Sequence, residues 1–218
     1  MNLSPHSAVC CIGVLLLGAA SPESQKTYTN NFEQAEVGKV PDDIMVLDGP
    51  FAVREVDRHK CLELAGDPIG SFGALFGPEG IAASDVKARI WAASAGKRFP
   101  EFGIGANDVG GYKLILAPGR RALELRKGDQ TATSVPAKWS TRTWTRLRLR
   151  VRSKDKKTWT IEGKIWPDGQ PEPREWTIRI EDREAPSPGK ASIWADDFSE
   201  QPVRFDDLGV MPIAGERK

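Results

Sequence analysis

A segment in the second half of the chain alternates strictly between apolar and basic residues. Leu147, Leu149 and Val151 occupy one set of positions, and the arginines from Arg146 to Arg152 occupy the other. Successive side chains of a β-strand point to opposite faces, so this pattern places the apolar groups on one face and the guanidinium groups on the other. A helix cannot separate the two sets in this way. The pattern therefore predicts a strand with one buried face and one polar face.

Similar runs recur along the chain, separated by turns rich in glycine and proline. Gly and Pro supply the backbone angles that tight turns require. Short strands at this spacing, without long helical patterns between them, are typical of all-β domains. The fold class that we predict is a two-sheet antiparallel β-sandwich of the jelly-roll type. Its strands are expected at residues 51–56, 61–65, 73–76, 86–92, 101–105, 112–117, 122–126, 145–151, 158–166, 175–180, 191–194 and 203–210.

Length and charge narrow the class of protein. The chain has 218 residues, which suits a single sandwich domain, and we place that domain at residues 28–213. Residues 21–27 are expected to be a linker and residues 214–218 a tail. The 31 basic and 30 acidic residues leave a net charge of +1. Nucleic-acid binders carry a marked basic excess, so we expect no nucleic-acid partner.

The first 20 residues have the pattern of a secretory signal peptide. They contain no Lys, Arg, Asp or Glu, and an apolar run from Val9 to Leu17 is followed by small residues up to Ala20. The run is shorter than the roughly 20 apolar residues that span a bilayer, so we expect cleavage rather than a membrane span. The sequence thus predicts a secreted or periplasmic protein. Cleavage removes two of the three cysteines and leaves Cys61 without an intrachain partner.

No catalytic motif stands out. His59 is the single histidine after the signal peptide, and it lies in a charged turn. A Ser-His-Asp or Cys-His nucleophile needs an imidazole in a cleft, and a zinc site needs more His or Cys ligands than the mature chain has. A glycosidase needs two facing carboxyl groups, and the many carboxylates do not single out a pair. The catalytic residues, if the chain is an enzyme, stay unknown.

The tryptophans carry the main indication of ligand binding. Flat indole rings stack on the apolar face of a sugar while nearby polar groups bond its hydroxyls. Trp91, Trp166 and Trp194 are out of register with the apolar residues beside them, so each is expected on a polar face. We predict that these three, with Arg89 on the face of Trp91 and Tyr112 near a loop, bind a ligand. The alternative is that these rings fill the core.

The remaining rings and the arginines have simpler interpretations. Trp144, Trp159 and Trp176 begin or share the apolar register of their strands, so they are expected in the core. The arginine stripe suits an anionic glycan, because guanidinium groups pair with carboxylate or sulfate. We favour cross-strand ion pairing instead, because neighbouring strands present glutamates such as Glu162 and Glu181.

The order of motifs resembles a known superfamily. The segments concerned are Asn31-Phe32-Glu33, Asp85 to Trp91, Phe102 to Gly105, Gly111 to Ile115, Leu123 to Arg126, Trp144 to Arg148, Gly189 to Trp194 and Arg204 to Val210. Across residues 28–212 this order resembles the concanavalin A-like lectin/glucanase superfamily. More narrowly, it is similar to secreted bacterial domains called laminin-G-like or 3-keto-disaccharide hydrolase-like.

The resemblance implies three alternative functions. The first is a non-catalytic carbohydrate-binding module, which fits the lack of the Glu-x-Asp-x-x-Glu run of true glucanases. The second is a glycoside hydrolase of the 3-keto-disaccharide hydrolase-like type, and the third is a structural envelope component that binds another protein. The resemblance also implies a structural calcium ion where the first and last strands meet, with Glu33 and Asp206 as its ligands. No other cofactor is expected.

Overall fold

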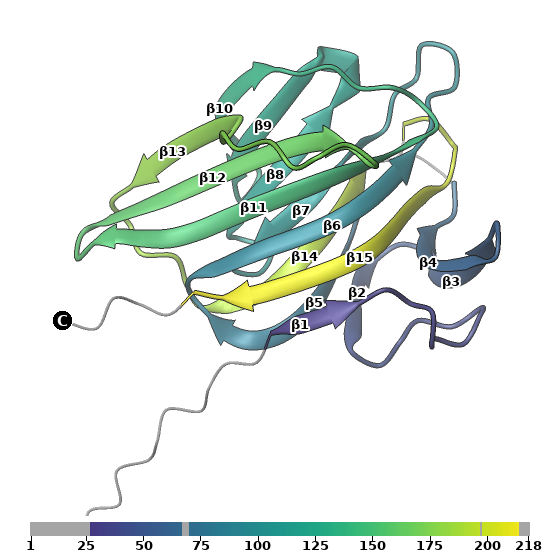
Figure 1. Ribbon diagram of the computed structural model, residues 1–218, viewed down its shortest axis with the longest axis horizontal. Coiled ribbons are helices and arrows are strands. Elements are labelled where there is room, and N and C mark those ends of the chain that lie inside the picture. Colours follow the sequence, from purple (N-terminus) through teal and green to yellow (C-terminus); the bar gives the residue numbers. More distant parts are fainter. Residues whose placement is uncertain (1–26, 67–69, 197, 214–218) are drawn as a thin grey trace, which may run out of the picture.

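The computed structural model describes residues 27–66, 70–196 and 198–213, and it is a sandwich of two antiparallel β-sheets (Figure 1). The predicted signal peptide lies outside the described residues. Sheet A runs in the order β13 (Ile178–Asp182), β12 (Thr158–Pro167), β11 (Thr143–Asp155), β6 (Ser84–Ala92), β15 (Val203–Pro212), β4 (His59–Leu64) and β3 (Phe51–Val56), and β1 (Tyr28–Asn30) pairs with β15. Sheet B runs in the order β10 (Gln130–Pro136), β9 (Ala122–Lys127), β8 (Tyr112–Ala117), β7 (Glu101–Ala106), β14 (Gly189–Asp196), β5 (Ser71–Ile81) and β2 (Ile44–Asp48).

The core lies between the inner faces of the two sheets. Leu147, Leu149 and Val151 of β11 are each 0% exposed, as the alternation predicts. Burying one such side chain stabilises the fold by about 1.5–3 kcal/mol. The sheets approach closely where a Cβ added to Gly163 of β12 would lie 2.4 Å from a methyl group of Leu114 on β8. Among the described residues the one helical element is a 3₁₀ turn at Pro118–Arg120, and no helix has the length and apolar character needed to cross a membrane.

The arginine stripe forms the outer face of sheet A, and its charges are paired. Arg150 donates to Glu162, its cross-strand neighbour, with Nε 2.9 Å from Oε2. Arg148 reaches the other adjacent strand, where its Nε lies 2.8 Å from Oδ1 of Asp85. Burial alone would raise the pKa of Glu162, but the hydrogen bond from Arg150 and the charges of nearby arginines hold that pKa below its ordinary value. The ion-pair interpretation of the stripe is therefore confirmed.

The connection between β12 and β13, residues 168–177, crosses the outer face of sheet A (Figure 1). Its Glu172 pairs with Lys164 at 2.8 Å and also with Arg148. The ring of Trp176 lies beside the same cations, with its centroid 4.5 Å from the guanidinium carbon of Arg150. The prediction that Trp176 lies in the core was wrong, because β13 begins only at Ile178 and the tryptophan belongs to the crossing segment. This segment adds Glu172 to the ion pairs of the outer face of sheet A.

Candidate functional site

Three tryptophans on adjacent strands form a row on the outer face of sheet A. They are Trp166 on β12, Trp144 on β11 and Trp91 on β6, and we call them the tryptophan row. Trp144 and Trp91 are direct cross-strand partners. Trp166 is opposite Arg146, two residues along β11 from Trp144, so all three rings share one face. Trp166 is 8% exposed, and the other two rings are half-buried.

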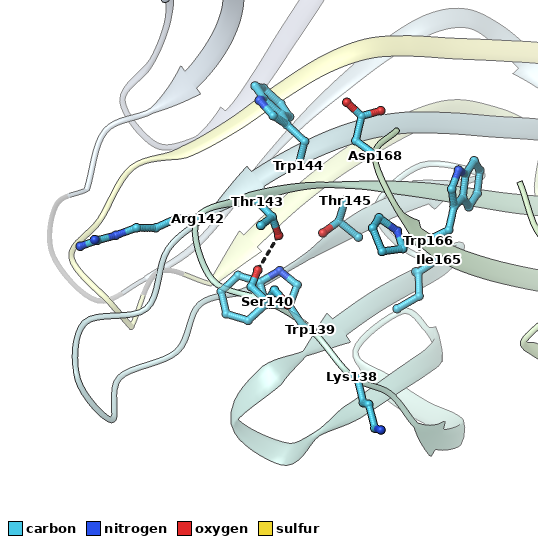
Figure 2. Close-up of a pocket in the computed structure, with 11 residues that line it drawn as sticks. Lys138, Trp139, Ser140, Arg142, Thr143, Trp144, Thr145, Ile165, Trp166 and Asp168 are labelled. Carbon is cyan, nitrogen blue, oxygen red and sulfur yellow. Dashed lines mark hydrogen bonds between the residues drawn. The ribbon is translucent and has the colours of Figure 1, made fainter. Parts of the chain in front are cut away.

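A hollow of about 500 Å³ lies at the end of this row, where the connection between β10 and β11 approaches the ends of β11 and β12. We call it hollow 1, and Figure 2 shows its lining. Its position follows from the pairing of β12, because β13 pairs with residues 159–163 and leaves the following residues without a neighbour on that side. Its walls are formed by Lys138, Trp139, Ser140, Arg142, Thr143, Trp144, Thr145, Ile165, Trp166, Pro167 and Asp168.

Trp139 brings a third indole to hollow 1 from the side of sheet B. Its ring packs edge-on against Phe102 of β7, with centroids 5.9 Å apart and an interplanar angle of 62°. Its Nε1 is buried and has no hydrogen-bond partner among the described residues. A buried donor without a partner costs about 1–3 kcal/mol.

A second hollow of about 190 Å³ adjoins the first, and we call it hollow 2. Among the described residues, Trp144 is the one that lines both hollows. Its ring centroid lies 4.4 Å from the guanidinium carbon of Arg89, and Trp91 is covered in the same way by Arg204 at 4.3 Å. Hollow 2 is lined by Val56, Asp57, His59, Lys60, Cys61, Arg89, Trp91, Trp144, Arg204 and Asp206.

The cations of the row already have carboxylate partners. Arg89 binds Asp206 and also donates to Asp168, with Nη1 3.3 Å from Oδ2. Arg204 donates to Glu63 on β4, with Nε 2.8 Å from Oε2. These pairs fix the guanidinium planes against the indole rings, and cation–π contacts of this kind contribute about 0.5–2 kcal/mol each. The rings are thereby held in defined positions.

Two aspartates near Arg89 have pKa values that are shifted in opposite directions. Burial raises the pKa of Asp206, whose side chain is 4% exposed, although Arg89 opposes the shift. At Asp168 burial also acts to raise the pKa, but hydrogen bonds from Arg146 and Arg89 outweigh it and lower the pKa. Two arginines on one aspartate keep it ionised, whereas one arginine on a buried aspartate does not fully offset the loss of water.

Among the predicted ligand residues, Trp91, Arg89 and Trp166 lie together on the outer face of sheet A. Tyr112 is elsewhere and is 1% exposed, and its hydroxyl donates to Asp182 at 2.7 Å. Its ring therefore offers no open face to a ligand. The pKa of Tyr112 is raised mainly by burial and, to a smaller extent, by this hydrogen bond.

Trp194 lies on the outer face of sheet B, apart from the row. Its neighbours on the adjacent strands are Gly73 and Gly103, so no side chain separates the ring from the sheet. A Cβ on Gly73 would lie 2.8 Å from the indole, which is too close for any residue but glycine without movement. The Nζ of Lys113 is 3.8 Å from the ring centroid, and Nε1 donates to Ser192 at 2.7 Å. Trp194 therefore belongs to a different surface from Trp91 and Trp166.

Sequence reasoning placed Trp144 in the core and did not single out Trp139. The sequence did indicate the direction of Trp144, because it lies two residues before Arg146 on the same strand and so shares the face of the arginines. Trp139 lies outside the strands, where no periodic pattern indicates direction. Only the three-dimensional arrangement brings it to hollow 1.

The predicted calcium ligands are engaged by other groups. Oε1 of Glu33 lies 3.2 Å from the backbone nitrogen of Lys60 and 3.5 Å from Nδ1 of His59. Asp206 is bound by Arg89. Calcium takes about six to eight oxygen ligands. Within the part of the chain that the structure describes, no three His, Cys, Asp or Glu side chains gather as a metal site.

Solved structures show what the fold is similar to. The carbohydrate-binding module CBM66 from Bacillus subtilis matches at a TM-score of 0.52 and 10% identity, covering 76% of this chain and 93% of that one. The exoplasmic/lumenal domain of VIP36, in its Ca²⁺/Man-bound form, matches at 0.53 and 10%, covering 88% and 91%. A mutant of the alginate lyase Aly36B in complex with alginate trisaccharide matches at 0.56 and 10%, covering 87% and 99%.

These likenesses confirm the predicted fold class, a sandwich of the concanavalin A-like type. Identities near 10% show the fold alone. No family model matches the sequence, and none of the curated proteins matches it.

Proposed function

We propose that this protein is a non-catalytic carbohydrate-binding domain, and that hollow 1 together with the tryptophan row is its binding site. The observation that carries the proposal is the position of Trp144, which lines both hollow 1 and hollow 2. Ligand sites are concave, largely apolar and furnished with a few polar groups, and hollow 1 has this character. Its lining residues include Trp139, Trp144 and Trp166 together with Ser140, Thr143 and Thr145.

The chemistry of the walls suits a pyranose ring. The C–H face of a sugar is apolar and packs on an indole, and its hydroxyl groups need donors and acceptors around the edge. Ser140, Thr143 and Thr145 line the hollow, and the backbone carbonyl of Ser140 accepts from Thr143 Oγ1 at 2.6 Å, which holds the loop in place. Arg89 packs against the indole of Trp144 and so holds the ring in a fixed position.

The names of the structural neighbours support a glycan partner. One is a carbohydrate-binding module, one is in a Man-bound form and one is in complex with alginate trisaccharide. Fold alone does not give function, which depends on the residues of the site. We favour binding over hydrolysis because the carboxylates of the row, such as Asp168 and Asp206, are bound by arginines rather than free to act on a glycosidic bond.

We further propose that the domain acts outside the cytoplasm, secreted or in a periplasm. This rests on the charge-free, apolar character of residues 1–20 and the small residues before Ser21. The absence of a second cysteine in the mature chain is consistent with a core that needs no disulfide. In this setting polysaccharides are common and accessible ligands.

Affinity electrophoresis tests the function. Native gels cast with different soluble polysaccharides should retard the wild-type protein in at least one gel, and Trp144→Ala should migrate unretarded there. Trp194→Ala is the matched control, since it removes a half-buried indole from the opposite sheet. A cleared zone behind the retarded band would instead indicate the glycoside hydrolase. Equal retardation of Trp144→Ala and the wild type would contradict the proposed site.

A further inference from the structure

The tryptophan row runs across the strands rather than along one of them. Trp166, Trp144 and Trp91 lie on three neighbouring strands, β12, β11 and β6. Neighbouring strands are about 4.8 Å apart, so the row extends over roughly 10 Å before hollow 2 is counted. This is longer than a single sugar ring. The length of the row therefore fits a chain of sugars better than a terminal monosaccharide.

The two hollows are placed to take successive residues of such a chain. Hollow 1 lies on the Trp166 and Trp139 side of Trp144, and hollow 2 lies on the Trp91 side. Their volumes are about 500 Å³ and 190 Å³, so the first is the larger and the second the smaller of the two. Hollow 2 has its own polar groups at the rim, including His59, whose side chain is 76% exposed.

The charges around the row point to an uncharged ligand. Arg89 and Arg204, the guanidinium groups that face hollow 2, are both bound to carboxylates. An anionic sugar would have to displace Asp206 or Glu63, and a displaced Asp206 would lose its arginine partner in a buried position. Figure 2 shows Arg142 extending away from the other residues of hollow 1.

We propose that the ligand is an uncharged glycan chain that lies across β12, β11 and β6 and fills hollow 1 and hollow 2 on either side of Trp144. This inference rests on the proposed function. It assigns hollow 2 and Trp91 to a second subsite, and it assigns Trp144 to both.

Calorimetric titration with neutral oligosaccharides of one to six residues tests the chain-length claim. Cello-, laminari-, manno- and xylo-oligosaccharides are suitable probes, because they differ in linkage and carry no charge. In the series that binds, we expect affinity to rise at least about tenfold between one and three residues. Trp91→Ala should lower the affinity for the trisaccharide to about that for the monosaccharide, a larger loss than it causes for the monosaccharide itself. Trp91→Leu, which keeps apolar bulk but no aromatic face, should behave in the same way.

The outcomes separate this inference from the proposed function. Affinity that does not depend on chain length, or an equal loss for every length in Trp91→Ala, would overturn the second subsite while the protein stays a carbohydrate binder. Oligogalacturonate and alginate oligosaccharides form the charged arm of the test. Binding of these at physiological salt, weakened by added salt, would overturn the claim of an uncharged ligand. Binding to no sugar in either arm would overturn the proposed function itself.

Discussion

The guanidinium carbon of Arg89 lies 4.4 Å from the ring centroid of Trp144, and the same guanidinium group binds the buried carboxylate of Asp206. Arg89 thus links a half-buried indole on β11 to an ion pair that extends to β15. In this arrangement the position of Trp144 depends on an arginine that makes no contact with hollow 1 itself.

Replacing Arg89 with methionine should destabilise the domain, because Asp206 would be left buried without its partner. Breaking one half of a buried ion pair costs about 3–5 kcal/mol, and we expect a loss toward the lower end of this range because Arg89 is 22% exposed. Urea unfolding followed by tryptophan fluorescence measures the change. Arg98→Met is the control, since its ion pair with Glu200 is exposed and should contribute less than about 1 kcal/mol. Equal effects of the two substitutions would contradict the account.

Replacing Leu149 with aspartate should prevent folding, because the new carboxylate would lie in the core at a position that is 0% exposed. A buried charge without a partner costs many kcal/mol, which exceeds the stability of a typical domain. Circular dichroism should show no cooperative melting transition. Ser153→Asp, at an exposed position of the same strand, should melt close to the wild type. A native melting curve for Leu149→Asp would refute the strand register.

Replacing Gly73 with alanine should strain the packing of Trp194, because the added Cβ would lie 2.8 Å from the indole. Overpacking of this kind costs about 1–3 kcal/mol. The midpoint of thermal unfolding should fall, whereas Gly110→Ala, where nothing lies within 4 Å of the added Cβ, should leave it nearly unchanged. Glycan affinity should stay at the wild-type value in both variants, since Trp194 is on sheet B. A loss of affinity in Gly73→Ala would place Trp194 in the binding site after all.

Stability should fall in acid between about pH 4 and pH 2 through Asp182. Burial acts to raise the pKa of this carboxyl, but hydrogen bonds from Lys127, the Glu184 backbone and Tyr112 outweigh it and lower the pKa from its ordinary 3.8 to about 2. A carboxyl with a lowered pKa in the folded state stabilises the fold above its unfolded pKa, and the stabilisation is lost as pH falls through the folded pKa. The difference in unfolding free energy between wild type and Asp182→Asn should therefore shrink from pH 5 to pH 2. A difference in unfolding free energy that stays constant from pH 5 to pH 2 would show that Asp182 does not cause the loss of stability in acid.

The fold was predictable because the alternation of apolar and polar residues is strong where one face of a strand is buried. The structure has β3 and β8 at the predicted bounds, residues 51–56 and 112–117. The sequence did not indicate β10, because it is an edge strand with mostly exposed, polar side chains and little alternation. Residues 77–80 fall between two predicted strands, but they lie within β5, where Gly77 and Gly80 take positive φ angles inside the strand.

The site was predictable only in part. Residue parity placed Trp91, Trp166 and Arg89 on a polar face, but parity cannot say which strands become neighbours. The row exists because β6 pairs with β11 and β11 with β12, and the register brings Trp91 opposite Trp144. Trp194 has the same sequence signal as Trp91, yet it belongs to the other sheet.

The most direct test of the central claim is the affinity of wild type and Trp144→Ala for the same neutral oligosaccharide, measured by calorimetry with folding checked by near-ultraviolet circular dichroism. Loss of one aromatic platform shared by two subsites should lower affinity at least about tenfold, while Trp194→Ala keeps wild-type affinity. A well-folded Trp144→Ala that binds as tightly as the wild type would contradict a binding site on the tryptophan row.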